Sequence, residues 1–139
     1  MVHALSEIRR VLVPEGILID LRPVLDRWTI EVVSTRETKQ TGRVTDYPIG
    51  LADDEAANKT LDQAGQDGWF VRDTSEFFTY SYSWDTPKEM EEWAAEEWED
   101  FIGLDDEAKR NTRSTWALGD ADSRVRLNVK MLITRWRKL

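Results

Sequence analysis

The stretch that decides the fold is Ala4–Pro23, which has the sequence ALSEIRRVLVPEGILIDLRP. The apolar residues of its first half recur with the spacing of one helix face, with charged residues opposite. Pro14 ends this helix because the residue before a proline avoids the helical region, and Gly16 predicts a turn position with positive φ. The short apolar run that follows is typical of a strand covered on both faces. The stretch therefore predicts a helix over 4–12, a tight turn and an inner strand over 16–21.

This succession of helix, Pro-x-Gly turn and apolar strand resembles the late part of class I S-adenosylmethionine-dependent methyltransferases. In that family a helix of the type L-x-E-I-x-R-V-L leads into K-P-G-G and then into an inner strand. The matching residues here are Leu5, Glu7, Ile8, Arg10, Val11 and Leu12, then Pro14 and Gly16, then Ile17 to Asp20. The resemblance implies that the strand is followed by a variable insert and then by an antiparallel strand pair at the edge of the sheet.

The cofactor-binding half of the family has no counterpart in this sequence. The family holds its cofactor with a D-x-G-x-G-x-G loop and an acidic residue on the second strand, and both precede the matching helix. Only Met1, Val2 and His3 precede it here, and the seven glycines of the chain are scattered. We therefore expect no catalytic and no cofactor-binding residue in this chain. S-adenosylmethionine would bind only if a second polypeptide supplied the missing half.

Composition narrows the function classes further. A length of 139 residues predicts a single domain over 1–139. The absence of cysteine removes disulfides and thiolate sites, and the single histidine, His3, removes Ser-His-Asp triads. A net charge of −8 argues against nucleic-acid binding, which requires positive charge to neutralise phosphates. No signal peptide and no run of 18 apolar residues occur, so we expect no membrane association and a cytoplasmic location.

The middle of the chain predicts a hairpin and a helix. The segments 28–34 and 43–47 are rich in β-branched residues, and a polar loop over 35–42 separates them. Asp53 or Asp54 can cap a helix that runs to about Gly65.

Aromatic side chains alternate along the next strand, over 69–84. Phe78, Tyr80, Tyr82 and Trp84 share one face of it. One interpretation is that these rings pack on a helix. The other is that they form the wall of a pocket for a flat or cationic ligand. The candidate pocket residues are Arg22, Trp28, Tyr80 and Trp84.

The clearest local signal is Thr86-Pro-Lys-Glu89, which predicts a capping box at the start of a helix. A second helix, capped by Asp105 or Asp106, is expected to run to about Leu118. Glu92 and Glu96 place carboxylates one turn apart, which could suit a hard cation. Histidine and a ligand loop are missing nearby, so we expect a solvated face and no metal site.

The last strand is predicted over 123–137, paired with 69–84. We expect Val125, Leu127, Val129, Met131 and Ile133 to face the core. The other face is basic, and its two interpretations are an anionic-ligand face and complementarity with the chain's own acidic helices.

Together these patterns predict an α+β fold, with a predominantly antiparallel, mixed sheet of about five strands and helices mainly on one face. The favoured function is a non-catalytic binding or interaction module derived from a methyltransferase. One alternative is the substrate-covering half of a split or N-terminally truncated small-molecule methyltransferase, and another is a small-molecule binder with an aromatic pocket. Because the cofactor half is missing, segment 1–21 is expected to expose apolar surface, with strand 16–21 at a sheet edge, and to form a homodimer or bind a partner polypeptide. The alternative is that the helices at 51–66 and 86–118 fold back to cover this surface within one chain.

Overall fold

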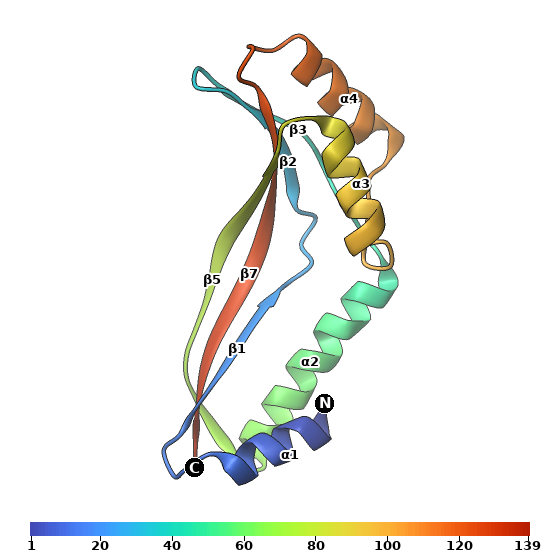
Figure 1. Cartoon of the computed structure of the whole chain (residues 1–139). Coiled ribbons are helices and arrows are strands. Elements are labelled where there is room, and N and C mark those ends of the chain that lie inside the picture. The colour runs from blue at the N-terminus through green and yellow to red at the C-terminus, as the bar shows by residue number, and fades with distance from the viewer. The chain divides into compact units, whose positions relative to one another are not determined.

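The computed structural model describes residues 1–139 and confirms the α+β class (Figure 1). Four helices accompany a mostly antiparallel sheet of about five strands. The helices are α1 (Val2–Val11), α2 (Pro48–Gln66), α3 (Pro87–Glu97) and α4 (Asp106–Ala117). The strands are β1 (Ile17–Pro23), β2 (Thr29–Val33), β3 (Thr38–Arg43), β4 (Thr45–Asp46), β5 (Phe70–Trp84), β6 (Ile102–Gly103) and β7 (Arg124–Lys138). As predicted, the last strand pairs with the long aromatic strand β5.

The chain divides into two compact units. The first, here called the terminal unit, comprises Met1–Val24, Ala52–Phe78 and Met131–Leu139. The second, here called the central unit, comprises Leu25–Leu51 and Thr79–Lys130. The strands β5 and β7 are long enough to contribute to both units.

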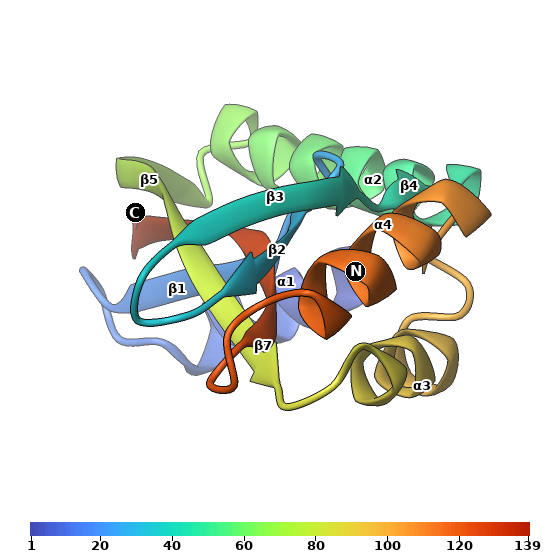
Figure 2. The ribbon, with the colours of Figure 1, turned by 90° about the horizontal axis from the view of Figure 1, so that it is seen from above.

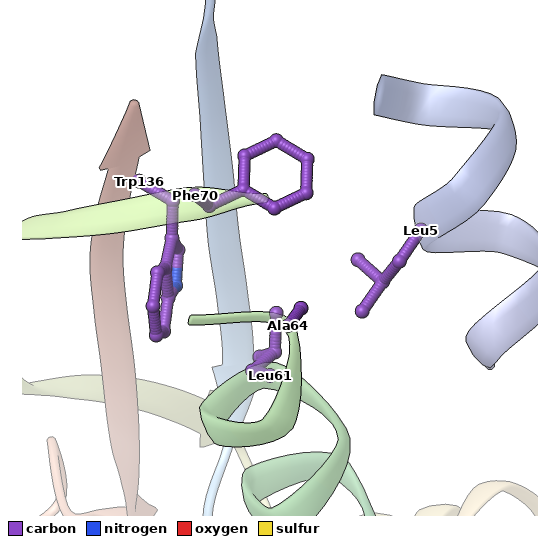
Figure 3. Packing of buried hydrophobic residues seen from close by; sticks show 5 residues of the cluster. All are labelled: Leu5, Leu61, Ala64, Phe70 and Trp136. Atoms are coloured by element: carbon purple, nitrogen blue, oxygen red, sulfur yellow. The ribbon is translucent and has the colours of Figure 1, made fainter. Parts of the chain in front are cut away.

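In the terminal unit, β1 pairs antiparallel with the second half of β7, from Ile17 opposite Arg137 to Pro23 opposite Met131. The helices α1 and α2 enclose a small core around the side chain of Trp136 (Figure 3). The other buried members of this core are Leu5, Leu61, Ala64 and Phe70. Of the apolar face predicted for the first helix, Leu5 is buried and Ile8 and Leu12 are partly buried within the same chain, whereas Val11 is 64% exposed.

The turn between α1 and β1 differs from the sequence expectation in one respect. The residue with positive φ is Glu15, at 65°, and not Gly16. Glycine is needed at position 16 for space, because a Cβ atom there would lie 2.7 Å from the carbonyl oxygen of Val13. The close return of the chain, and not the backbone angle, selects this glycine.

In the central unit, β2 lies between β3 and the first half of β7. Figure 2 shows α4 lying beside β3, and Ala108 of this helix faces Gly42. The prediction of a loop over 35–42 was wrong, because Thr38–Arg43 forms the outer strand. This segment is polar since it lies at the sheet edge, where only Thr41 is buried. The predicted strand 43–47 is reduced to β4, which pairs with β6.

Two of the predicted helix starts have the predicted capping residues. The Thr86 hydroxyl accepts from the Glu89 amide, and the Glu89 carboxylate accepts from the Thr86 amide, which completes the capping box. Asp105 caps α4 by accepting from the Ala108 amide at 2.7 Å. For α2 the prediction was wrong, because the helix begins at Pro48 instead of at Asp53 or Asp54.

The burial pattern of β7 changes along the strand. In the central unit the odd-numbered Val125, Leu127 and Val129 are buried, as predicted. In the terminal unit the buried residues are the even-numbered Leu132, Thr134 and Trp136, so the prediction of Met131 and Ile133 as core residues was wrong. One regular alternation of buried and exposed residues along the whole strand could not predict this change from odd-numbered to even-numbered buried residues. The change occurs because each unit buries a different face of β7.

Candidate functional site

The aromatic candidates are part of one ring cluster in the central unit. Trp28 is only 2% exposed and meets the Trp98 ring edge-on at 5.0 Å. Trp93 of α3 joins Trp98 to Trp84, with ring centres 6.0 and 5.1 Å apart. Tyr82 contacts Trp93, Trp84 and Tyr80 in turn. Tyr82 and Trp84 of β5 thus pack on the helix α3, whereas Phe78 and Tyr80 of the same strand are 42% and 51% exposed.

The fourth candidate, Arg22, lies in the terminal unit and is enclosed by polar groups of β1 and α2. Its guanidinium donates to the carboxylate of Asp20 at 3.2 Å and to the amide oxygen of Asn58, and it lies 3.8 Å from the Asp54 carboxylate. The side chain is only 16% exposed. The neighbours of Arg22 are thus two carboxylates and an amide, which hold the strand against the helix, and no aromatic ring is among these contacts.

The basic residues of β7 have acidic partners in the same chain. In the central unit Arg126 donates to Glu31 at 2.6 Å and Lys130 donates to Asp26 at 2.8 Å. These partners lie in strands and turns and not in the acidic helix α3, whose Glu91 is paired with Arg113. The pKa of the Asp26 carboxyl is lowered, first by the hydrogen bond from Lys130 and then by its charge.

The most conspicuous surface of the terminal unit is the uncovered face of β1. Burial alternates along this strand: Leu18, Asp20 and Arg22 are half-buried, whereas the residues between them are exposed. Ile17, Ile19 and Leu21 are 38%, 49% and 55% exposed. The sequence predicted this exposed apolar row of Ile17, Ile19 and Leu21 only in part. The apolar run Ile17–Ile19 predicted a strand covered on both faces, whereas the missing cofactor half predicted exposed apolar surface over segment 1–21. Leu21 was not singled out.

The backbone of the same three residues points to an open edge. β1 is the last strand in the order β1-β7-β2-β3, so it has a partner on one side only. The Lys138 amide donates to the Gly16 carbonyl at 2.8 Å, so even-numbered residues of β1 direct their hydrogen bonds toward β7. Because hydrogen-bonded and non-hydrogen-bonded positions alternate in an antiparallel pair, Ile17, Ile19 and Leu21 direct theirs away from it. The apolar side chains and the backbone N–H and C=O groups of Ile17, Ile19 and Leu21 are therefore both accessible to a partner.

Charged groups border this apolar row on β7. Arg137 and Arg135 lie opposite Ile17 and Ile19 in the strand register. Arg137 contacts Glu15 at 2.8 Å and Asp73 at 3.3 Å, and Arg135 lies 3.6 Å from Asp73. The hydrogen bonds with Glu15 and Asp73 raise the pKa of the Arg137 guanidinium above its ordinary value. The arginines are held by acidic partners of their own chain, so the row itself carries no charge.

Concave sites are also present in both units. In the terminal unit a cavity of about 220 Å³ lies between α1 and α2, with Leu5 and Trp69 in its wall. In the central unit a cavity of about 440 Å³ is lined by both apolar and charged groups, among them Tyr47 and Lys109. Neither contains any of the four candidate pocket residues.

Neither a metal-ligand cluster nor a membrane-spanning helix is found. No three histidine, aspartate or glutamate side chains converge in a way that would hold a metal ion. None of the helices has the length and apolar character that crossing a bilayer requires. Comparisons with protein-family models, with curated proteins and with solved structures each returned no match.

Proposed function

We propose that this chain is a non-catalytic interaction module, derived from an S-adenosylmethionine-dependent methyltransferase, that binds another polypeptide at the open edge of β1. The observation that carries the proposal is the coincidence of exposed Ile17, Ile19 and Leu21 with unpaired backbone groups on the same three residues. An edge strand of this kind is a template for pairing with another chain. An uncovered apolar row commonly belongs to an interface.

The derivation from a methyltransferase is supported by the order of the elements. A helix, a Pro-x-Gly turn and a strand open the chain, and the last strand, β7, lies between β1 and β5. The resemblance implies such a strand pair after a variable insert. In the parent fold the inner strand is covered by the cofactor-binding half, and the open edge of β1 corresponds to that side of the strand.

The interaction function can be tested with a peptide of this chain's own sequence. The probe is a fluorescein-labelled peptide of residues 15–23, EGILIDLRP, and the readout is fluorescence polarisation with the full chain. We expect saturable binding that the double variant Ile19→Lys/Leu21→Lys abolishes, because two ammonium groups then lie at the edge. Leu118→Lys, at a position 87% exposed in the central unit, is the matched control and should bind normally. Absence of saturable binding by the wild-type chain would contradict the proposal.

The split enzyme is the second candidate, because the open edge is where the resemblance places the cofactor-binding half. Calorimetry distinguishes the two functions. The chain alone should show no heat of binding with S-adenosylmethionine, since no glycine-rich loop offers backbone amides for it. If binding appears on adding the cofactor half of a class I methyltransferase, and disappears with Ile19→Lys, the split enzyme is the better description. Micromolar binding by the chain alone would contradict both.

A further inference from the structure

The row of available groups on β1 is short and has defined ends. Outward-facing amides and carbonyls belong to Ile17, Ile19 and Leu21, because even-numbered residues bond to β7. The next outward-facing residue is Pro23, which has no N–H to donate. A strand that docks here is therefore limited to the span from Ile17 to Leu21.

This span is complementary to itself. When two identical strands pair antiparallel about a two-fold axis, the facing residue numbers have a constant sum, and the outward-facing residues must face one another. An axis at Ile19 places Ile19 opposite Ile19 and Ile17 opposite Leu21, so all three outward residues find partners. Each facing pair then exchanges two N–H···O bonds, and each brings two exposed apolar side chains together.

Other registers of the same two strands are less favourable. An axis at Asp20 would place the two Asp20 carboxylates directly opposite each other, which is destabilising. An axis at Leu18 or Leu21 would leave one of the three outward residues without an apolar partner. With the axis at Ile19, Asp20 faces Leu18 and Arg22 faces Gly16, so no like charges are opposed.

We propose that the polypeptide bound at this edge is a second copy of the chain, paired β1 to β1 about a two-fold axis at Ile19. This inference rests on the proposed interaction function and specifies its partner. Isologous pairing is the commonest arrangement in homodimers. The dimer uses a single short strand from each copy, so we expect dissociation in the micromolar range.

A competing surface exists on β5. Phe77 and Phe78 of this strand are 60% and 42% exposed. The same stretch carries Arg72, Asp73 and Glu76, and charged residues are the usual means of protecting an edge from pairing. The exposed row of β1 has no such protection, which favours β1 over β5.

Sedimentation and light scattering of the full chain test whether the partner is a second copy of the chain, because both methods measure the molecular mass in solution. We expect a dimer at micromolar concentration, an apparent mass reduced by half in Ile19→Lys, and an unchanged dimer in the controls Phe77→Lys and Leu118→Lys. A monomeric wild-type chain that still binds the labelled peptide would overturn the inference while leaving the interaction function in place. A dimer that Phe77→Lys disrupts and Ile19→Lys does not would overturn it as well.

Single cysteine variants test whether the two-fold axis lies at Ile19. Any disulfide must form between the introduced cysteines, because the natural chain contains no cysteine. Facing Cα atoms in a hydrogen-bonded antiparallel pair are about 5.5 Å apart, which a disulfide can span. We expect oxidised Ile19→Cys to cross-link to itself. Ile17→Cys and Leu21→Cys should cross-link only when mixed. Efficient self-cross-linking of Ile17→Cys, without that of Ile19→Cys, would show that the axis lies elsewhere.

Discussion

The terminal and central units differ in how completely they bury their apolar side chains. The central unit contains large buried side chains from several segments, with Trp28, Ile30 and Met90 almost completely buried. The terminal unit has a small core around Phe70 and Trp136 and leaves one face of β1 uncovered. The difference is that the larger apolar core lies in the central unit, whereas the terminal unit leaves the row of Ile17, Ile19 and Leu21 exposed.

The largest effect is expected from Trp28→Ala. This side chain joins the aromatic cluster to the core of the central unit, so its removal should lower the free energy of unfolding by about 3–5 kcal/mol. Trp69→Ala is the control, because Trp69 is half-buried in the terminal unit. Urea titrations compare them. Equal losses in the two variants would remove the distinction between the units.

Leu5→Ala should cost less and act locally. Leu5 is 5% exposed in the small core of the terminal unit, and its truncation should lower the free energy of unfolding by about 2–3 kcal/mol. Amide hydrogen exchange is expected to accelerate in α1 and β1 and to stay unchanged in β2 and α4. If all four elements lose protection together, the two units unfold as one cooperative structure.

The next largest loss of stability is expected when a buried pair of hydroxyls in the central unit is disrupted. The Thr41 and Thr112 hydroxyls are 2.7 Å apart and buried. Thr112→Val should cost about 1–2 kcal/mol, because Thr41 keeps only a long contact with the Ile30 carbonyl. The double variant Thr41→Val/Thr112→Val should cost less than the sum of the single variants, since no unpaired hydroxyl remains. Additive losses in thermal denaturation would contradict this coupling.

Thr86→Ala should lower the free energy of unfolding by about 1 kcal/mol through loss of the α3 cap. Lys88→Ala is a suitable control, because Lys88 is exposed and has only a pair with Glu92 one turn away. Melting temperatures that are the same for both variants would mean that the cap does not stabilise the central unit.

The smallest effect concerns pH. The backbone amide of Thr35 donates to the Asp122 carboxylate and lowers the pKa of this group below 3.8. A carboxyl whose pKa is lower when folded stabilises the fold above its unfolded pKa and loses this contribution as pH falls through the folded pKa. Acid denaturation of Asp122→Asn should therefore be less steep below pH 3.8 than that of the natural chain. NMR titration of Asp122 gives a direct measurement, and an ordinary pKa would contradict the expectation.

Local signals predicted much of this fold. The first helix, the first strand and the Thr86 capping box depend on neighbouring residues, and the structure confirms that they form. The prediction of an inner first strand was wrong, because β1 lies at the edge of the sheet, and the positive φ in the turn belongs to Glu15 instead of Gly16. The outer strand Thr38–Arg43 was missed because it has a single buried residue and hence no apolar alternation. The apolar run of β1 could not reveal that one face is open, since a strand covered on one side by helices can have the same sequence.

The candidate site depended on contacts between distant segments, which is why its prediction was less successful. Arg22 and Trp28 are close in sequence, yet Arg22 is held by Asp54 and Asn58 of α2 in one unit and Trp28 belongs to the ring cluster of the other. The open edge of β1 follows from which strands pair with β7, and no local pattern specifies that order.

The aromatic cluster also gives the protein an optical property. All of the seven tryptophans except Trp69 and Trp136 belong to the central unit. Indoles at the spacing of Trp84, Trp93 and Trp98 exchange excitation energy, so ultraviolet light absorbed by one is emitted by another. Intrinsic fluorescence and near-ultraviolet dichroism of this chain therefore report mainly on the central unit. For the β1 edge the reporter is Trp136, which lies opposite Leu18 of β1 in the strand register.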